Sequence, residues 1–250
     1  MSDILRSLPG LSVNRSGPGG ALTQLRLRGS EASHILVLID GIEVANPTAG
    51  EFDLSGLRSE DIVRIELLSG EQSALYGSDA VGGVLNIITT AGSTQRAFTA
   101  SVEAGSFDTF NGQASAVIPF GSASLSISGG GLTTDGYDIS GMDGEADGST
   151  NETLNIGVNG LALGGLTLSG KVALSKLEAE FDEDSDFDGR LNDTDSVTNV
   201  DTVSARLAAT FDLAGFSHVV SAARHEITTD TQAGFSSRSD GERDLSLIHI

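Results

Sequence analysis

The stretch SALYGSDAVGGVLNIIT, Ser73–Thr89, decides the fold of the first third of this chain. Its first half is rich in glycine, and Gly77, Gly82 and Gly83 permit positive φ angles or close approach of the backbone. Its second half, Val84–Thr89, is a short apolar run that is typical of a buried strand. We therefore expect a compact unit with this strand at its centre.

The segments before this stretch predict further short elements. Ser2–Leu8 has the pattern of a short helix that Pro9-Gly10 ends. Leu36–Ile39 is an apolar strand that stops at Asp40-Gly41, a favourable pair for a tight turn, and Ile62–Leu68 alternates like a strand. Because the composition changes near residue 92, these elements predict a small α+β domain that spans residues 1–92.

Beyond residue 95 the chain alternates apolar and polar side chains with a period of two. Serines separate Ala123, Leu125 and Ile127, and the segments Leu166–Leu174 and Val203–Leu213 repeat the pattern. Alternation over about ten residues per segment is typical of membrane barrel strands. We count about seven or eight such strands in residues 93–250. A soluble β-sandwich has a similar period, so periodicity alone leaves both architectures open.

The connections between the predicted strands are alternately short and long. Tight turns are expected at Gly121, at Gly164-Gly165 and at Ala214-Gly215, whereas Gly131–Asn151 and Glu180–Val200 are expected to be long polar loops. Short turns on one side and long loops on the other side are the arrangement of outer-membrane barrels.

Composition excludes several classes of protein. The chain has 14 Lys and Arg against 35 Asp and Glu, a formal net charge of −21 and no Cys. This acidity argues against a nucleic-acid partner and suits hard cations, while thiolate metal sites are excluded. No apolar run is long enough for a transmembrane helix, and no signal peptide is visible. We therefore expect the chain to be a fragment of an exported protein.

Five segments in order resemble the plug domain of TonB-dependent outer-membrane receptors, and within that family they are most similar to the cobalamin (corrinoid) receptors. The last of them is the stretch that opened this section. The other four are LPGLSV at Leu8–Val13, LRLRG at Leu25–Gly29, SHILVLIDG at Ser33–Gly41 and VRIELLSG at Val63–Gly70.

The resemblance implies a fold and a function. It implies a small α+β plug domain, residues 1–92, followed by the first antiparallel transmembrane strands of a truncated 22-stranded β-barrel, residues 93–250. The protein would lie in the bacterial outer membrane, contact its lipid, and import cobalamin or a related corrinoid with energy supplied through TonB. The TonB-contacting box lies upstream of the plug and is missing. Plug arginines such as Arg28 and Arg64 would face acidic residues of the barrel.

Two other functions stay open. An iron-siderophore receptor of the same family differs only in its bulky nutrient ligand. A calcium-dependent β-rich surface adhesin or structural domain belongs to another class, and would explain the acidity and the alternation but not the ordered plug segments. We find no catalytic triad and no nucleotide-binding loop, so we do not expect an enzyme or a redox cofactor.

The resemblance also locates the ligand. By position, two loops match the substrate-facing plug loops of the cobalamin receptors. The expected substrate-binding residues are Ser16, Gly17, Pro18, Gly19, Gly20, Ala21 and Leu22 in the first loop, and Asn46, Pro47, Thr48, Ala49, Gly50 and Glu51 in the second.

The acidic loops predict a structural Ca²⁺ site in two alternative ways. Asp184–Asp195 fits the twelve-residue calcium-loop template, with Gly189 at the sharp turn. By order, the calcium-binding aspartates of cobalamin receptors instead match a second set, and Asp193 belongs to both. A plainly solvated acidic loop remains the alternative. The candidate ligands are Asp138, Glu145, Asp147, Asp182 and Asp193, with Asp184, Asp186, Asp188 and Asp195.

Overall fold

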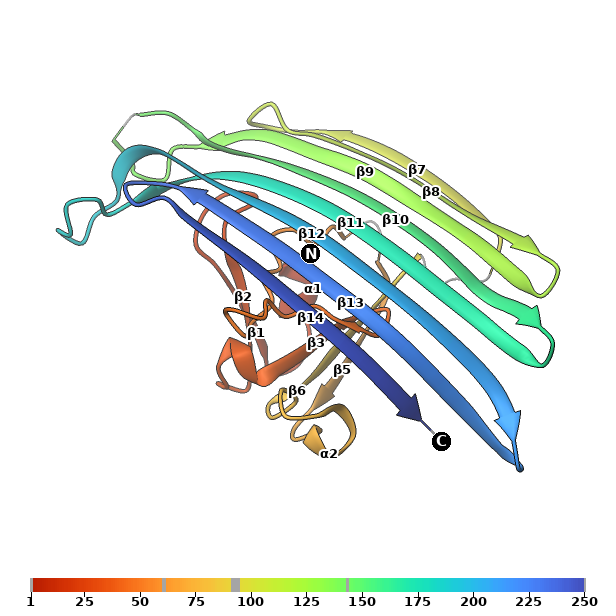
Figure 1. The fold of residues 1–250 in the computed structure, drawn as a ribbon. Coiled ribbons are helices and arrows are strands. Elements are labelled where there is room, and N and C mark those ends of the chain that lie inside the picture. Colours follow the sequence, from red (N-terminus) through yellow and green to blue (C-terminus); the bar gives the residue numbers. More distant parts are fainter. Residues whose placement is uncertain (1, 60–61, 91–94, 143, 250) are drawn as a thin grey trace.

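The computed structural model describes residues 2–59, 62–90, 95–142 and 144–249. It consists of an N-terminal domain that lies against the concave side of a curved eight-stranded sheet (Figure 1). The predicted domain boundary between residues 92 and 93 falls within 91–94, outside the described residues. Within the described ranges, no helix has both the length and the apolarity needed to cross a membrane.

The N-terminal domain is the small α+β unit that the sequence predicts. Its central sheet has the order β4-β3-β6-β5, in which β3 and β6 run parallel, and β1 and β2 form a separate antiparallel ladder. The elements are α1 (Ser2–Arg6), β1 (Leu11–Arg15), β2 (Thr23–Leu27), the 3₁₀ turn η1 (Ala32–His34), β3 (Ile35–Ile39), β4 (Ile42–Glu43), β5 (Ile62–Ser69), α2 (Ser73–Tyr76) and β6 (Gly83–Thr89).

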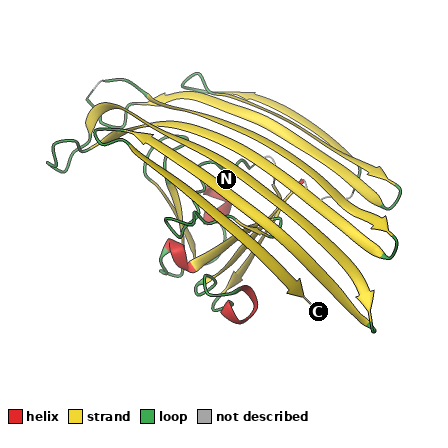
Figure 2. Cartoon of the chain, viewed as in Figure 1, coloured by secondary structure: helices red, strands yellow, loops and turns green. Residues whose placement is uncertain are grey.

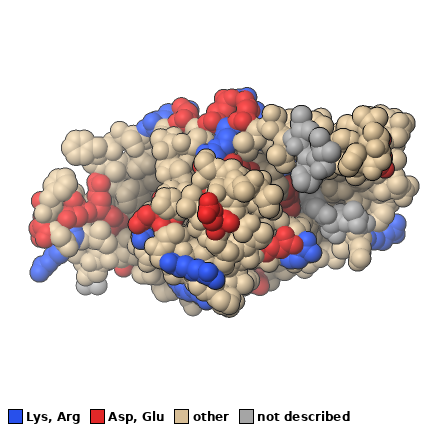
Figure 3. Space-filling view, turned by 90° about the horizontal axis from the view of Figure 1, so that it is seen from below, with Lys and Arg blue, Asp and Glu red and all other residues tan. Residues whose placement is uncertain are grey.

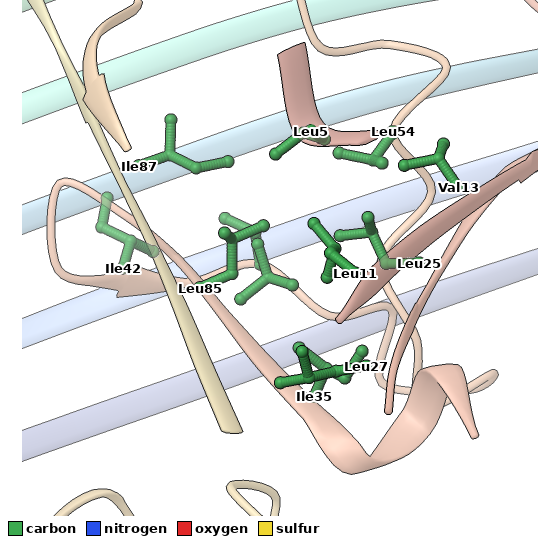
Figure 4. Packing of buried hydrophobic residues seen from close by; sticks show 12 residues of the cluster. Leu5, Leu11, Val13, Leu25, Leu27, Ile35, Ile42, Leu54, Leu85 and Ile87 are labelled. Carbon is green, nitrogen blue, oxygen red and sulfur yellow. The ribbon is translucent and has the colours of Figure 1, made fainter. Parts of the chain in front are cut away.

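One apolar core holds this domain together (Figure 4). Leu5 of the first helix and Leu85 and Ile87 of β6 are completely buried in it. On its other face, β6 packs Val84 against Leu36 in a smaller cluster. Because β6 is buried on both faces, the apolar run that opened the sequence analysis is the central strand that its composition predicts.

Residues beyond 95 form one antiparallel sheet in which the strands follow chain order (Figure 2). It has eight strands, in agreement with the predicted seven or eight, and β7 and β14 are its open edges. The strands are β7 (Ala97–Ala104), β8 (Phe110–Phe120), β9 (Ala123–Tyr137), β10 (Asp147–Leu163), β11 (Leu166–Glu183), β12 (Asn192–Leu213), β13 (Phe216–Gln232) and β14 (Ser237–His249).

The two faces of this sheet differ in the way that the alternation predicts. Leu154, Leu174 and Val203 are neighbours across three strands, and each is about two fifths exposed. They belong to an apolar band on the side away from the N-terminal domain. Ser126 and Ser204, on the opposite face, are buried. A continuous band of exposed apolar side chains suits contact with lipid.

The two long polar loops are much shorter than predicted. Most of Gly131–Asn151 is strand, and only 138–146 connect β9 with β10. Most of Glu180–Val200 is also strand, which leaves 184–191 as the loop. The polar residues of these segments still pair across the ladder, because a polar side chain does not prevent backbone pairing. The tight turns lie where they are expected, at Gly121, Gly164-Gly165 and Ala214-Gly215.

The two arginines that were expected to face acidic residues of the sheet do not do so among the described residues. Arg64 pairs with Glu66 of its own strand at 2.8 Å, and Arg28 is exposed. The observed ion pairs have the opposite polarity, because the cations belong to the sheet. Lys171 pairs with Asp40 of the N-terminal domain, and both side chains are 9% exposed. Arg243 pairs with Glu43 and Asp79 of the same domain.

We expect residues 1–92 to fold without the sheet, because all the buried residues of the main core cluster belong to this segment. Leu85→Ala should lower the free energy of unfolding by about 2–5 kcal/mol, since it leaves a cavity in that core. The control Leu75→Ala, at a side chain that is 76% exposed, should change it by about 0.5 kcal/mol or less. Denaturant unfolding measures both values. A segment 1–92 without protected amides in hydrogen exchange would contradict this prediction.

Candidate functional site

Two loops of the N-terminal domain face the sheet. A backbone hydrogen bond of 3.1 Å between its first and last residues closes the loop 16–22, and a bond of 2.8 Å closes the loop 46–51 in the same way. In the second loop, Asn46 Oδ1 also accepts the N–H of Thr48 at 2.8 Å. Both loops therefore have a fixed shape of their own.

These loops and the inner face of β10–β13 enclose a cavity of about 600 Å³. Such a volume suits a small-molecule ligand. Of the residues expected to bind substrate, those that line the cavity are Ser16, Pro18, Gly20, Ala21, Leu22, Asn46, Ala49 and Glu51. Those that lie in the same loops without lining it are Gly17, Gly19, Pro47, Thr48 and Gly50.

The loop 16–22 is pressed against the sheet. Gly20 has a φ of 89°, and a Cβ at this position would stand 2.6 Å from the Cβ of Ser149. A Cβ on Gly17 would lie 3.7 Å from Cδ1 of Ile139, which belongs to the loop 138–146 and lines the cavity. The position of that loop of the sheet therefore shapes the cavity.

Three aspartates from separate segments meet beside the cavity. Asp138, Asp182 and Asp193 place one carboxylate oxygen each within 4.8 Å of one another. Asp182 is buried and lines the cavity, and its oxygens accept the N–H groups of Ser140 at 2.9 Å and of Thr194 at 2.8 Å. The backbone of the loop 138–146 and that of β12 therefore hold this carboxylate in place.

Two further acidic residues lie against these three. The hydrogen bond between Glu145 and Asp193, with desolvation and the repulsion of nearby carboxylates, raises the pKa of Glu145 to about 7. Asp147 is 1% exposed and accepts the N–H of Ile139 at 2.9 Å. We call the five residues the carboxylate cluster: Asp138, Glu145, Asp147, Asp182 and Asp193.

The carboxylate cluster has the chemistry of a site for a hard divalent cation. Its hydrogen-bond donors are backbone N–H groups and the hydroxyl of Ser140, which lowers the pKa of Asp138. Within the described part of the chain, no Lys or Arg forms an ion pair with these carboxylates. Oxygen ligands that repel one another are the ligands that Ca²⁺ prefers, because the ion neutralises them.

A second group of carboxylates lies in the loop 184–191, at the end of the molecule where acidic side chains gather (Figure 3). Asp184, Asp186 and Asp188 approach one another within 4.8 Å. Asp184 accepts the N–H groups of Asp188 at 3.0 Å and of Gly189 at 2.8 Å, and Gly189 has a φ of 87°. This is the turn that the calcium-loop template predicts for its first half.

The second half of that template does not form a loop. β12 begins at Asn192, so the backbone is extended where a twelve-residue loop would curl back. Asp193 consequently joins the carboxylate cluster, and Asp195 is exposed and belongs to neither group. The interpretation of Asp184–Asp195 as one loop is therefore wrong, and the two alternative sets of ligands are two separate groups.

Sequence reasoning missed Glu180. This residue lines the cavity, and its carboxylate accepts the N–H of Gly148 at 2.8 Å. It stands two residues before Asp182 in the same acidic run, which was the available signal. The sequence predicts a loop from Glu180 to Val200, whereas Glu180 lies in β11. A strand position that faces the cavity was therefore not expected for it.

Residues 1–84 match the family described as the TonB-dependent Receptor Plug Domain. We refer to the N-terminal domain below as the plug, after the family whose model it matches. The family match thus covers the domain whose loops form one wall of the cavity, and it agrees with the order of segments quoted from the sequence. The sheet beyond the plug lies outside the matched residues, so its similarity to known proteins is a similarity of fold alone.

Solved receptors have the fold of the whole chain, plug and sheet together. The siderophore receptor PirA from Acinetobacter baumannii has a TM-score of 0.67 and 19% identity, over 99% of this chain and 41% of the receptor. The ferric-catecholate import receptor Fiu from E. coli K12 has a TM-score of 0.70 and 16% identity, over 98% of this chain and 40% of the receptor. The ferric yersiniabactin uptake receptor FyuA from Yersinia pestis has a TM-score of 0.66 and 20% identity, over 99% of this chain and 42% of the receptor. The chain spans about two fifths of the length of these receptors.

A half-buried carboxyl in the cavity wall provides a test of the plug structure. Burial raises the pKa of Asp53, although the N–H groups of Thr23 and Ser55 each donate to its Oδ1 at 2.9 Å. The folded plug therefore binds a proton more tightly than the unfolded chain. The plug should accordingly lose stability as the pH rises from the ordinary carboxyl pKa through the raised one.

Asp53→Asn keeps the acceptor oxygen and removes the buried charge. The stability of the segment 1–92 should then vary less with pH, above the ordinary aspartate pKa of about 4, than that of the wild type. Urea unfolding at a series of pH values measures this slope, with Glu71→Gln at an exposed position as the control. Equal slopes for Asp53→Asn and the wild type would contradict the prediction.

Proposed function

We propose that this chain is the plug and the first barrel strands of an outer-membrane receptor that imports an iron-siderophore complex with energy supplied through TonB. The observation that carries the proposal is the cavity enclosed by two plug loops and the polar inner face of the sheet. Its wall has both apolar and hydrogen-bonding groups, which suits a bulky nutrient ligand. The apolar band on the outer face of the sheet supports contact with outer-membrane lipid.

The choice of a siderophore changes the substrate that the sequence suggested. Cobalamin was expected from the resemblance of the plug segments, whereas the three solved receptors with the same fold are named for siderophores or ferric complexes. A corrinoid remains the second candidate, because the carboxylate cluster has the residue order of the calcium-binding aspartates in cobalamin receptors. A surface adhesin does not account for the plug domain, and a receptor fold gives no support to an enzyme.

We also propose that Ca²⁺ is a structural cofactor of this receptor. Asp182 belongs to the carboxylate cluster and lines the cavity, and Ile139 lies next to Asp138 and contacts the plug loop. An ion in the cluster would fix the loop 138–146 and thereby the cavity wall. Ligand binding would then lose less conformational entropy, so Ca²⁺ would raise the affinity without contact with the ligand.

Asp193→Ala should weaken Ca²⁺ binding by about tenfold or more, because it removes one of the three converging carboxylates. Asp195→Ala is the matched control, since this aspartate lies two residues further on the same strand and in neither group. Calorimetry on the full-length receptor measures both variants, and Asp186→Ala reports separately on the loop 184–191. Equal affinity of Asp193→Ala and the wild type would exclude the carboxylate cluster as the site.

The full-length receptor should support growth of a siderophore-uptake mutant on its ferric siderophore, and not growth of a corrinoid-uptake mutant. Removal of Ca²⁺ should weaken ligand binding by about five- to 150-fold, the usual range of coupling between two sites. Growth with a corrinoid alone would replace the substrate but keep the receptor. Tight ligand binding that does not respond to Ca²⁺ would remove the proposed role of the ion.

A further inference from the structure

The cavity is acidic on both of its walls. Glu51 and Asp53 belong to the plug wall, and Glu180 and Asp182 belong to the sheet wall. We call these four residues the lining carboxylates. A ligand that fills a cavity of about 600 Å³ lies between the two walls, so it interacts with negative charge from both sides.

Among the described residues, the lining carboxylates have no cationic partner. Glu51 accepts the amide N–H of Gln24 at 2.8 Å, and Asp53 accepts the backbone N–H groups of Thr23 and Ser55. On the sheet wall the donors are also backbone N–H groups. Burial raises the pKa of Asp53, and the nearby charge of Glu51 adds to this effect. Uncharged donors therefore hold the lining carboxylates in place without neutralising them.

The two cations in the described part of the cavity wall, Arg58 and Lys171, already have partners. Lys171 pairs with Asp40 of the plug. Arg58 is buried and donates to Oδ1 of Asn111 at 2.7 Å and to the carbonyl of Gly112 at 3.2 Å. Neither cation can balance the charge of an anionic ligand without losing these contacts. Such a ligand would face the lining carboxylates directly, and like charges brought together weaken binding.

Ca²⁺ in the carboxylate cluster would leave this preference in place. The ion would neutralise charge around Asp182, which belongs both to the cluster and to the lining carboxylates. Glu51 and Asp53 are residues of the plug and lie outside the cluster. The plug wall of the cavity therefore stays negative when the proposed ion is bound.

A buried histidine in the same wall lacks a hydrogen bond. His225 is 2% exposed and lines the cavity from β13. Its Nδ1 lies 2.8 Å from Oγ of Ser204 on the neighbouring strand. Within the described ranges its Nε2 is buried and has no hydrogen-bond partner. An unpaired buried nitrogen costs free energy, which a hydrogen bond to a ligand would offset.

We propose that the ligand of this cavity is a ferric chelate of the hydroxamate class without net negative charge, whose ammonium group lies between the lining carboxylates. Three hydroxamate groups balance the charge of Fe³⁺, so a free amine on the same molecule makes the complex cationic. Three catecholate groups instead leave the complex with three negative charges. Unpaired charges in a binding site reject the competitor that carries the same sign. The amide groups of such a chelate can also form the missing hydrogen bond with His225. This assignment rests on the proposed import of an iron-siderophore complex and gives that complex a chemical class.

Binding of four ferric chelates to the full-length receptor tests the charge preference. Three of them share one linear trihydroxamate whose terminal amine is free, acetylated or succinylated, so that the complex is cationic, neutral or anionic. The fourth is a tricatecholate. Calorimetry in the presence of Ca²⁺ should show that the cationic complex binds about tenfold or more tighter than the anionic trihydroxamate, with the neutral complex between them. The tricatecholate should bind most weakly.

Variants of the cavity wall separate charge from general damage. Glu51→Gln keeps an acceptor for Gln24 and should weaken the cationic complex by about five- to tenfold, while the neutral complex changes by less than about twofold. Asp53→Asn carries the same test if Glu51→Gln does not fold. Glu71→Gln is the matched control, because it makes the same charge change at an exposed plug position outside the lining, and should bind like the wild type. His225→Phe should weaken the cationic and neutral complexes alike, by about two- to tenfold, because it removes a hydrogen bond and no carboxylate.

Equal affinity for the cationic and the anionic trihydroxamate, or tighter binding of the tricatecholate, would overturn the proposed class and leave siderophore import in place. A wild-type charge preference in both Glu51→Gln and Asp53→Asn would overturn the role of the lining carboxylates. Wild-type affinity of His225→Phe would overturn the contact with Nε2. Binding of none of the four chelates would overturn this proposal together with the import of a siderophore, so the two failures are distinguishable.

Discussion

Backbone pairing between neighbouring strands is the constraint on which the rest of this structure depends. The eight strands are antiparallel and in register over most of their length, so successive side chains must point to opposite sides. One side carries the apolar band that Leu174 and Val203 share, and the other carries small polar residues such as Ser126 and Ser204. Because these inward side chains are small, the concave side leaves room for the plug and for a cavity beside it.

A single strand links the three features of the candidate site. β11 contributes Asp182 to the carboxylate cluster, Leu177 and Ala179 to the cavity wall, and Lys171 to the ion pair with Asp40 of the plug. A paired strand at the centre of a sheet is stiff, so the carboxylate cluster, the cavity and the ion pair with Asp40 keep fixed distances along it. The plug touches this strand through its loops and through the turn at Asp40, which hydrogen bonds to Thr89 fix within the plug.

Elements with a strong local pattern were predictable from the sequence, and those defined by polarity alone were not. The apolar run Val84–Thr89 and the turn Asp40-Gly41 occur as predicted, since burial and positive φ angles leave clear marks on composition. The long loops were overestimated because polar residues also occupy strand ends that extend into water. For the same reason Glu180 was overlooked, and Asp193 and Asp195 were placed in one loop.

The sequence by itself determined the period of the strands, the sites of the tight turns and the order of the plug segments, because steric limits on φ and the alternation of side chains act between near neighbours. Only the tertiary structure decided which carboxylates converge and how the plug is held. Asp40 and Lys171 are 131 residues apart, and no local pattern relates them. Their contact depends on strand register and on the curvature of the whole sheet, and many strand pairings together set both. Register and curvature place the cation of the sheet opposite the carboxylate of the plug.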